Sequence, residues 1–394
     1  MVKNAQLSFT DTQIAFSSKS DSELMKTYAL FASMDYPSLV KVGTFLISGA
    51  FKINLPIKPL VKHTLFTQFC GGESIKDCQN TIEKLGEYKI GTILDYSVEG
   101  AHNDKSFNET EKEIILTIQK AATSKHVPFS VFKVTGIAPV PLLEKVQAGE
   151  ALSEKEQETW DKAQERVDHL CRSAYEHGVR IFIDAEETWI QKVIDDLAMD
   201  MMRKYNKEEA IVYNTYQMYL HAKLEQLKGD LEVAKTEGFK LGVKLVRGAY
   251  MEKEAKRAAE MGYQNPIQPS KEACDNDYNA ALKLIVENHN HFALCAGTHN
   301  EKSSMYLAEL MSKMGISESN KDFYFAQLYG MSDHISYNLS NSGYNVAKYV
   351  PYGPVKEVMP YLFRRAEENT SIAGQSSREF MLVKQEMKRR KESK

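Results

Sequence analysis

The sequence lacks the cysteine patterns that disulfide frameworks and zinc sites require. It has only five cysteines, an odd number, and no two of them form a CxxC pair. They are scattered along the chain at Cys70, Cys78, Cys171, Cys274 and Cys295. This usage excludes a disulfide scaffold and a zinc knuckle, and it is typical of a protein from a reducing compartment.

Long apolar runs and targeting signals are also missing. The most apolar stretch, residues 42–53, contains Lys52 and is too short for a transmembrane helix. The first residues resemble neither a secretory signal nor an arginine-rich transit peptide. We therefore expect a cytoplasmic protein with peripheral contact to an inner membrane. The alternative is a mitochondrial protein from which a presequence has been removed.

The chain has no excess of positive charge. It contains 50 Lys and Arg against 53 Asp and Glu, a net charge of -3, so we expect no nucleic-acid partner. The last eleven residues, 384–394, are the exception, with six Lys or Arg and two Glu. Two interpretations stay open for them: the end of a solvated helix, or a weak anchor on anionic lipid. Neither GxGxxG nor a P-loop pattern occurs, which excludes a Rossmann or Walker nucleotide site.

The chain does contain a regular alternation of apolar runs and amphipathic stretches. Residues 1–87 have a helical pattern, and from about residue 88 short apolar runs alternate with longer helical stretches. The runs are 90–94, 129–134, 179–183, 211–213, 241–246, 292–296, 323–326 and 344–350. Runs that are apolar on both faces and alternate with helices predict a parallel sheet. About eight such units favour a closed (β/α)8 TIM-like barrel over an open sheet.

These patterns divide the chain into three expected parts. They are an N-terminal helical region (1–87), a catalytic (β/α)8 barrel (88–378) and a basic C-terminal tail (379–394). One segment of the barrel, residues 137–158, departs from the alternation, with Pro139 and Pro141 near its start. We interpret it as an enlarged loop after the second strand, for which the role of a lid is open.

Polar side chains follow nearly every predicted strand. In a (β/α)8 barrel, the active-site residues come from the carboxyl ends of the strands. The residues at these ends are Asp95, Lys133, Asp184, Asn214, Lys244, Arg247, Thr298, His299, Asn300, Gln327 and Tyr349. Each of them alone can be a helix cap or a loop residue, but together they predict a ring of active-site groups.

Two adjacent arginines, Arg364 and Arg365, follow the last predicted strand. Glu368 lies four residues after the first and three after the second, so it can reach either guanidinium group on a helix. Two interpretations are open: a surface ion pair, or a rigid fork that binds a substrate carboxylate.

A carboxylate cluster, Asp184 with Glu186 and Glu187, follows the third predicted strand. Such a cluster could bind Mg²⁺, but Lys133 at the same rim would repel a cation. We therefore expect no metal site.

Four ordered motifs resemble the signatures of the proline dehydrogenase family. They are KLVRGAY at 244–250, GTHN at 297–300, QLYGM at 327–331 and YLFRRAEEN at 361–369. The resemblance extends from about Phe9 to Arg378, and it is strongest to the monofunctional, eukaryotic-type branch of the family.

This resemblance implies an FAD-dependent oxidation of L-proline to 1-pyrroline-5-carboxylate, the first step of proline catabolism. Hydride would pass from C5 of proline to flavin N5, and the electrons would then pass to a quinone. The resemblance implies catalytic roles for Lys133, Asp184, Arg364 and Arg365. It implies substrate contacts for Lys133, Leu328, Tyr349, Tyr361, Arg364 and Arg365. It implies FAD contacts for Asp184, Asn214, Lys244, Val246, Arg247, Gly248, Ala249, Tyr250, Thr298, His299, Asn300, Gln327 and Glu368.

The chemistry of the residues agrees with these roles. A cationic, dry pocket binds the proline carboxylate and disfavours a protonated ring amine, and the cofactor carries the redox chemistry. Within the family the alternative is a hydroxyproline dehydrogenase, although Tyr349 should crowd a ring hydroxyl. From other classes, a metal-dependent barrel lyase or hydrolase could use Asp184, Glu186 and His299, and a catalytically inactive barrel could serve as a binding scaffold.

Overall fold

The computed structural model describes residues 7–34, 43–47, 49, 55–97, 103–371 and 375–393. Within these ranges, the side chains of residues 366–371 and 375–377 are left out of the description.

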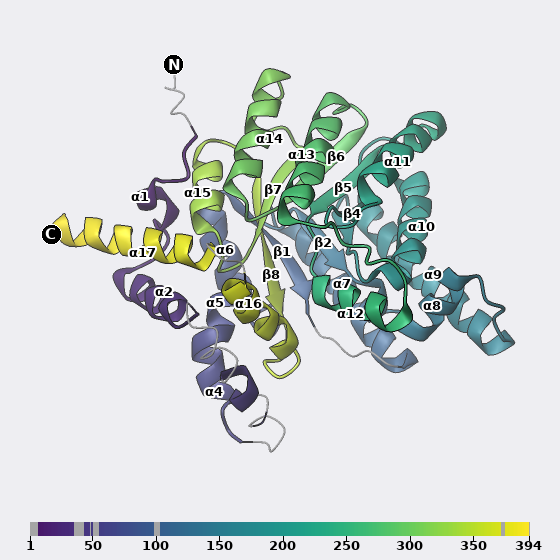
Figure 1. The fold of residues 1–394 in the computed structure, drawn as a ribbon, viewed down its shortest axis with the longest axis horizontal. Helices are drawn as coiled ribbons and strands as arrows, with labels where there is room; N and C mark the ends of the chain where they lie inside the picture. Colours follow the sequence, from purple (N-terminus) through teal and green to yellow (C-terminus); the bar gives the residue numbers. More distant parts are fainter. Residues whose placement is uncertain are drawn as a thin grey trace. The chain divides into compact units, whose positions relative to one another are not determined.

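Eight parallel strands follow one another around a closed barrel in the order β1 to β8 (Figure 1). They are β1 (Ile90–Tyr96), β2 (Phe129–Phe132), β3 (Arg180–Ile183), β4 (Val212–Gln217), β5 (Leu241–Val246), β6 (Phe292–Gly297), β7 (Phe323–Leu328) and β8 (Val346–Tyr352). The predicted (β/α)8 fold is therefore confirmed, with one strand at each predicted run. The largest difference is β4, which continues from the predicted run to Gln217.

Aromatic side chains fill the space between the strands β2, β3 and β4. The rings of Phe129 and Phe182 stack with their centroids 4.4 Å apart. Tyr213 meets both rings edge-on, at 5.5 and 5.4 Å. These three residues are buried, and Phe129 and Tyr213 stand near the amino ends of their strands. Aromatic packing therefore occupies the region near the amino ends of these strands, away from the polar residues at their carboxyl ends.

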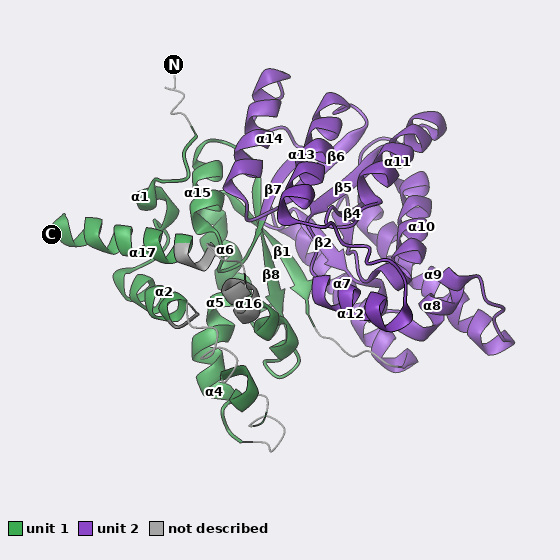
Figure 2. Ribbon diagram, in the orientation of Figure 1, with its two compact units in different colours: residues 1–99, 327–394 green, residues 100–326 purple. Residues whose placement is uncertain are grey.

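The chain divides into two compact units, coloured separately in Figure 2. Unit 1 combines residues 1–99 with residues 327–394, and unit 2 contains residues 100–326. These bounds differ from the three parts expected from the sequence, because unit 1 joins the N-terminal helices to the last strand and the C-terminal helices. Each unit is described by itself below.

Unit 2 holds the helices that follow β2 to β6, together with the helix before β2. They are α7 (Asp104–Thr123), α8 (Val140–Ala148), α9 (Glu154–Glu176), α10 (Thr188–Tyr205), α11 (Lys223–Glu237), α12 (Met251–Met261), α13 (Lys271–Glu287) and α14 (Glu301–Lys313). The segment 137–158, expected to be an enlarged loop, is largely helical. Its prolines start α8, since proline fits the first helical turn. Ser153 then starts α9 through a capping box with Glu156.

Unit 1 holds the N-terminal and C-terminal helices. They are α1 (Thr12–Ala15), α2 (Asp21–Met34), α4 (Lys58–Val61), α5 (Thr67–Phe69), α6 (Gln79–Glu87), α15 (Asp333–Asn341), α16 (Met359–Ser371) and α17 (Gln375–Glu392), with a π-helical turn at Lys62–Phe66. Side chains from both ends of the chain share one apolar cluster, which includes Phe16, Phe31, Phe66, Leu362 and Val383.

The basic C-terminal stretch forms the end of α17. Two of its cations are used inside unit 1, because Arg389 and Arg390 both pair with the buried Glu386 at 2.8 Å. Arg390 also pairs with Asp21 of α2 at 2.9 Å. Across the described residues, no helix combines the length and the apolar character that crossing a membrane requires.

Candidate active site

The centre of the candidate site in unit 2 is an acid held between two lysines. Asp184 directly follows β3, Lys133 directly follows β2, and Lys244 lies within β5. The Asp184 carboxylate is 3.2 Å from the Lys133 Nζ and 2.6 Å from the Lys244 Nζ. The side chains of Asp184 and Lys244 are only 10% and 12% exposed, whereas that of Lys133 is 31% exposed. Lys133 is therefore the more accessible of the two cations.

A second acid, Glu186, is fixed beside this cluster. Its carboxylate accepts hydrogen bonds from the backbone N–H of Thr135, at 3.0 Å, and from the Thr135 hydroxyl. Burial raises the pKa of Glu186 to about 7, against the lowering effect of the Thr135 bonds. From the sequence, Glu186 was considered only as a metal ligand, so this position beside the Asp184 cluster was not predicted. The spacing of two residues from Asp184 could have indicated it.

The end of β5 is joined to the turn after β6 by Arg247. Its guanidinium donates to the Thr298 Oγ1 at 2.6 Å and to the Ser303 Oγ at 2.9 Å. It also pairs with Asp275 of α13 at 2.7 Å. The Thr298 Oγ1 accepts from the backbone N–H of Asn300 at 3.1 Å. The predicted residues Arg247, Thr298 and Asn300 therefore lie together.

The turn after β6 begins α14. The side chain of Asn300 caps this helix, because its Oδ1 accepts from the backbone N–H groups of Lys302 and Ser303 at 2.9 and 3.2 Å. His299 is half-buried between Thr298 and Asn300. Backbone N–H groups and a helix dipole at such a terminus favour anionic groups.

The turn from β5 into α12 requires a glycine. Gly248 has φ 144°, and a Cβ at this position would approach the ring of Tyr219 to 2.3 Å. Gly248 and Ala249 are exposed, and they lie between the half-buried Val246 and Tyr250. Small exposed residues between larger flanking side chains let a ligand approach the backbone closely.

One predicted cofactor residue of unit 2 is engaged elsewhere. The Asn214 side chain is fully buried and donates to Asp195 of α10 at 2.9 Å. Its Oδ1 accepts from the backbone N–H of Thr215, also at 2.9 Å. Gln217, the last residue of β4, donates to the backbone carbonyl of Glu186 at 2.8 Å. Asn214 is thus placed against α10, whereas Gln217 supports the loop after β3.

The other predicted residues belong to unit 1. Gln327 is buried and accepts from the Ser336 hydroxyl at 2.8 Å. Leu328, the last residue of β7, is half-buried, and its backbone carbonyl lies 3.4 Å from the buried Lys348 Nζ. Tyr349 of β8 is buried, and its carbonyl accepts from the backbone N–H of Tyr329 at 2.9 Å.

The arginine pair lies on α16. Arg365 is buried, with its guanidinium 5.1 Å from the ring centre of Tyr361, and Arg364 is half-buried. This burial disfavours the interpretation of the pair as an exposed surface ion pair. The predicted partner Glu368 belongs to the same helix, but its side chain lies outside the described residues.

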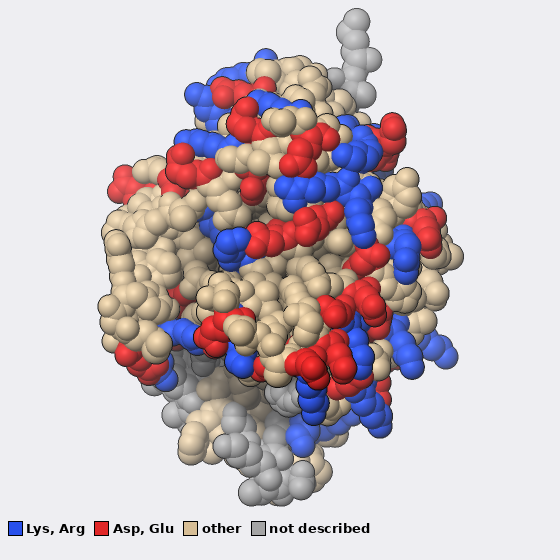
Figure 3. All heavy atoms as spheres, turned by 90° about the vertical axis from the view of Figure 1, so that its right-hand side faces the viewer, with Lys and Arg blue, Asp and Glu red and all other residues tan. Residues whose placement is uncertain are grey.

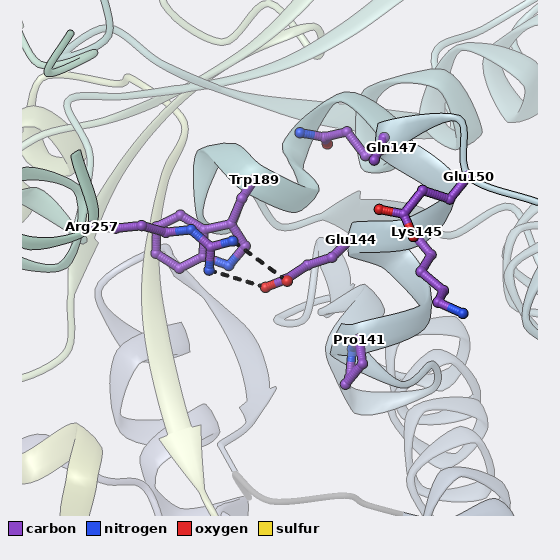
Figure 4. A pocket seen from close by; sticks show the side chains of 8 residues that line it. Pro141, Glu144, Lys145, Gln147, Glu150, Trp189 and Arg257 are labelled. Atoms are coloured by element: carbon purple, nitrogen blue, oxygen red, sulfur yellow. Dashed lines mark hydrogen bonds and ion pairs between the residues drawn. The ribbon is translucent and has the colours of Figure 1, made fainter. Parts of the chain in front are cut away.

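A separate hollow of unit 2, about 410 Å³ in volume, lies between α8, α10 and α12 (Figure 4). The Arg257 guanidinium lies 4.4 Å from the ring centre of Trp189 and pairs with Glu144 at 3.2 Å. None of the lining residues belongs to the predicted site. In the described part of the chain, no group of three His, Cys, Asp or Glu side chains is arranged to hold a metal ion.

Comparisons with known proteins were made for the whole chain. The family model described as proline dehydrogenase matches residues 78–378. The chain belongs to the proline dehydrogenase family. This confirms the resemblance found in the sequence and the prediction of an oxidoreductase that acts on proline.

Individual relatives agree with the family. The chain is 33% identical to proline dehydrogenase 1, mitochondrial, of Dictyostelium discoideum, over 96% of this chain and 74% of that protein. It is 31% identical to proline dehydrogenase 2, mitochondrial, of Arabidopsis thaliana, over 98% and 90%. Its fold resembles the crystal structure of proline utilization A from Bdellovibrio bacteriovorus inactivated by N-propargylglycine. That match has a TM-score of 0.71 and 20% identity, and it covers 93% of this chain and 37% of the other.

Proposed function

We propose that this chain oxidises L-proline to 1-pyrroline-5-carboxylate with FAD as the hydride acceptor, as the first step of proline catabolism. The observation that supports the proposal most is the Lys133–Asp184–Lys244 cluster, in which Lys133 and Asp184 follow β2 and β3 and Lys244 lies within β5. All three residues lie within the region 78–378 that the proline dehydrogenase family model matches.

In this proposal, cations bind the substrate carboxylate. We assign Lys133, Arg364 and Arg365 to this role, because a guanidinium or ammonium group binds a carboxylate through charge-assisted hydrogen bonds. The exposure of Lys133 and the burial of Arg365 beside Tyr361 support the assignment. The same positive charges disfavour a second cation nearby and so keep the ring nitrogen of proline neutral.

Apolar side chains would enclose the proline ring. We assign Leu328, Tyr349 and Tyr361 to contacts with its methylene groups, since all three are buried or half-buried in unit 1. Their packing would exclude water and restrict the orientation of the C5–H bond.

The donor set of unit 2 fits an anionic dinucleotide cofactor. Lys244 and Arg247 supply two cations on one strand end, the exposed Gly248 and Ala249 permit close approach, and Asn300 starts a helix. We assign FAD contacts to the residues predicted from the sequence: Asp184, Asn214, Lys244, Val246, Arg247, Gly248, Ala249, Tyr250, Thr298, His299, Asn300, Gln327 and Glu368. When bound, FAD supplies the hydride acceptor. Asn214 would have to release Asp195 to take part.

We further propose that the electrons pass to a quinone, so that the protein works at the surface of a membrane. The two relatives above are named mitochondrial. Their names support the mitochondrial alternative, and nothing among them supports the cytoplasmic expectation.

The visible spectrum of the purified protein tests the proposal directly. We expect flavin absorbance that bleaches when L-proline is added without oxygen, and weaker bleaching with 4-hydroxyproline. Faster bleaching with 4-hydroxyproline would instead assign the alternative substrate. A colourless protein that stays colourless after reconstitution with FAD would refute the flavin assignment.

A further inference from the structure

The segment 36–72 of unit 1 differs in charge from the rest of the chain. It contains four lysines, Lys41, Lys52, Lys58 and Lys62, and no Asp or Glu, although the whole chain has 53 acidic residues. By contrast, Figure 3 shows a face on which Lys and Arg are interspersed with Asp and Glu.

The same segment exposes large apolar side chains. Phe45 is 77% exposed, Leu46 62%, Leu55 49% and Leu60 66%. In the part of the chain that the structure describes, Phe45 has the highest value of any large apolar side chain. Most other exposed residues of this kind stand singly, as is normal on a soluble surface. Four exposed side chains of this kind fall within residues 45–60, and exposed apolar side chains that gather in one region mark interaction sites.

The patch is attached firmly to unit 1. Residue Ile47, next to Leu46, and residue Ile57, three before Leu60, both pack against the apolar cluster of this unit. Val61, next to Leu60, is 1% exposed and belongs to the cluster itself. In Figure 1, α4 and the dark purple helical turn of residues 43–47 are drawn at the same end of unit 1. The inward side chains of this segment are therefore already packed in unit 1, whereas the outward ones remain exposed.

We propose that this patch, defined by Phe45, Leu46, Leu55 and Leu60 with Lys58 and Lys62, docks on an anionic lipid bilayer. Apolar side chains flanked by lysines are typical of segments that lie in the membrane interface. Each lysine near an anionic leaflet adds to the attraction. Glu73 pairs with Lys58 and Lys62 at 2.8 and 2.6 Å, and its single charge offsets only one of these two lysine charges.

A bilayer fits the patch better than a second copy of the chain does. A symmetric dimer would place the patch against itself and bring lysines of like charge together. The C-terminal stretch is a weaker candidate, because Arg389 and Arg390 are paired with Glu386. The inference rests on the proposed function in one respect: a quinone acceptor lies in a membrane, which gives the enzyme a reason to bind one.

Flotation of the full-length protein with vesicles tests the proposal. We expect binding to vesicles of phosphatidylglycerol and phosphatidylcholine, with weaker binding to phosphatidylcholine alone and a decrease in added salt. The triple variant Phe45→Ser, Leu46→Ser, Leu60→Ser should bind anionic vesicles at least ~10-fold more weakly, because burial of apolar area contributes to interfacial binding. The matched control is Met261→Ser with Met314→Ser, two methionines that are 66% and 46% exposed elsewhere. It should bind as the unchanged chain does.

A second measurement does not depend on the triple variant. Phe45→Trp should give an emission spectrum that shifts to the blue with anionic vesicles, relative to the unchanged chain. Equal flotation of the triple variant and the unchanged chain would overturn the proposal. A dimeric unchanged chain beside a monomeric triple variant would also overturn it, because the patch would then bind a second copy of the chain. Flotation is measured without proline. Its failure beside intact flavin bleaching overturns the docking surface alone, whereas loss of bleaching with intact flotation overturns the proposed function alone.

Discussion

Removal of the Asp184 charge should destabilise the protein more than removal of either lysine that it pairs with. In Asp184→Asn, the ammonium groups of Lys133 and Lys244 lose their shared counter-ion. In Lys244→Met, the Asp184 carboxylate keeps Lys133 at 3.2 Å. Breaking a buried ion pair by removing one partner costs about 3–5 kcal/mol. We expect Asp184→Asn within this range and Lys244→Met below it.

A nearby pair supplies the matched control. Lys253 and Glu187 lie 2.8 Å apart, close to the 2.6 Å of the Lys244–Asp184 pair, but the Lys253 side chain is 62% exposed. An exposed pair contributes about 0–1 kcal/mol. Lys253→Met should therefore have little effect, although the distances are similar.

The assay is urea denaturation of each variant with excess FAD, with the flavin content measured in the same samples. Bound ligand stabilises the folded state, so the order of the variants is compared at one FAD concentration. An order in which Lys244→Met or Lys253→Met costs more than Asp184→Asn would refute the reasoning. Lys133→Met, at the exposed end of the cluster, should raise the KM for proline with a smaller loss of stability.

Three further predictions concern other residues. Arg365→Met should raise the KM for proline at least ~10²-fold with normal flavin content, because a buried charged contact contributes about 2–5 kcal/mol; unchanged proline kinetics would contradict its role. Glu186 has a pKa raised to about 7 from 4.5, so its ionisation costs stability as the pH rises through this window, by about 3 kcal/mol at most. Glu186→Gln should therefore flatten the decline of Tm between these pH values, and a slope like that of the unchanged chain would exclude the assignment. Tyr349→Ser should raise the ratio of kcat/KM for 4-hydroxyproline over proline, since a pocket change of this size shifts selectivity by about 1–3 kcal/mol. A ratio that moves toward proline would mean that Tyr349 does not face the ring.

The strands and their polar ends were predictable because both follow from local pattern. A buried strand reads as a short apolar run, and the residue after it lies at the carboxyl end of the strand. Lys133 and Asp184 each follow their strand directly, as expected. The segment 137–158 was predicted less well, because prolines are common both in loops and in the first turn of a helix, and here they start α8.

The partners of these side chains could not be read from the sequence. Asp184 pairs with a lysine 60 residues away, and the Thr188 hydroxyl and N–H donate to Glu254 across 66 residues, at 2.6 and 2.7 Å. Glu254 lies on α12, between β5 and α13, whereas Thr188 begins α10. Such pairs depend on the relative positions of strands and helices that no local period specifies. Asn214 illustrates the same limit, because its sequence position gives no sign of its bond to Asp195.

The distant partners compensate the negative charge of the acidic loop after β3. Asp184, Glu186 and Glu187 are three carboxylates within four residues, and they would repel one another if all were charged and unpaired. Each instead has its own compensation: lysines for Asp184, the Thr135 donors and a raised pKa for Glu186, and Lys253 for Glu187. The loop thereby holds Asp184 between Lys133 and Lys244. Lys133 is the more exposed of these two lysines, and it is the one that we propose for the substrate carboxylate.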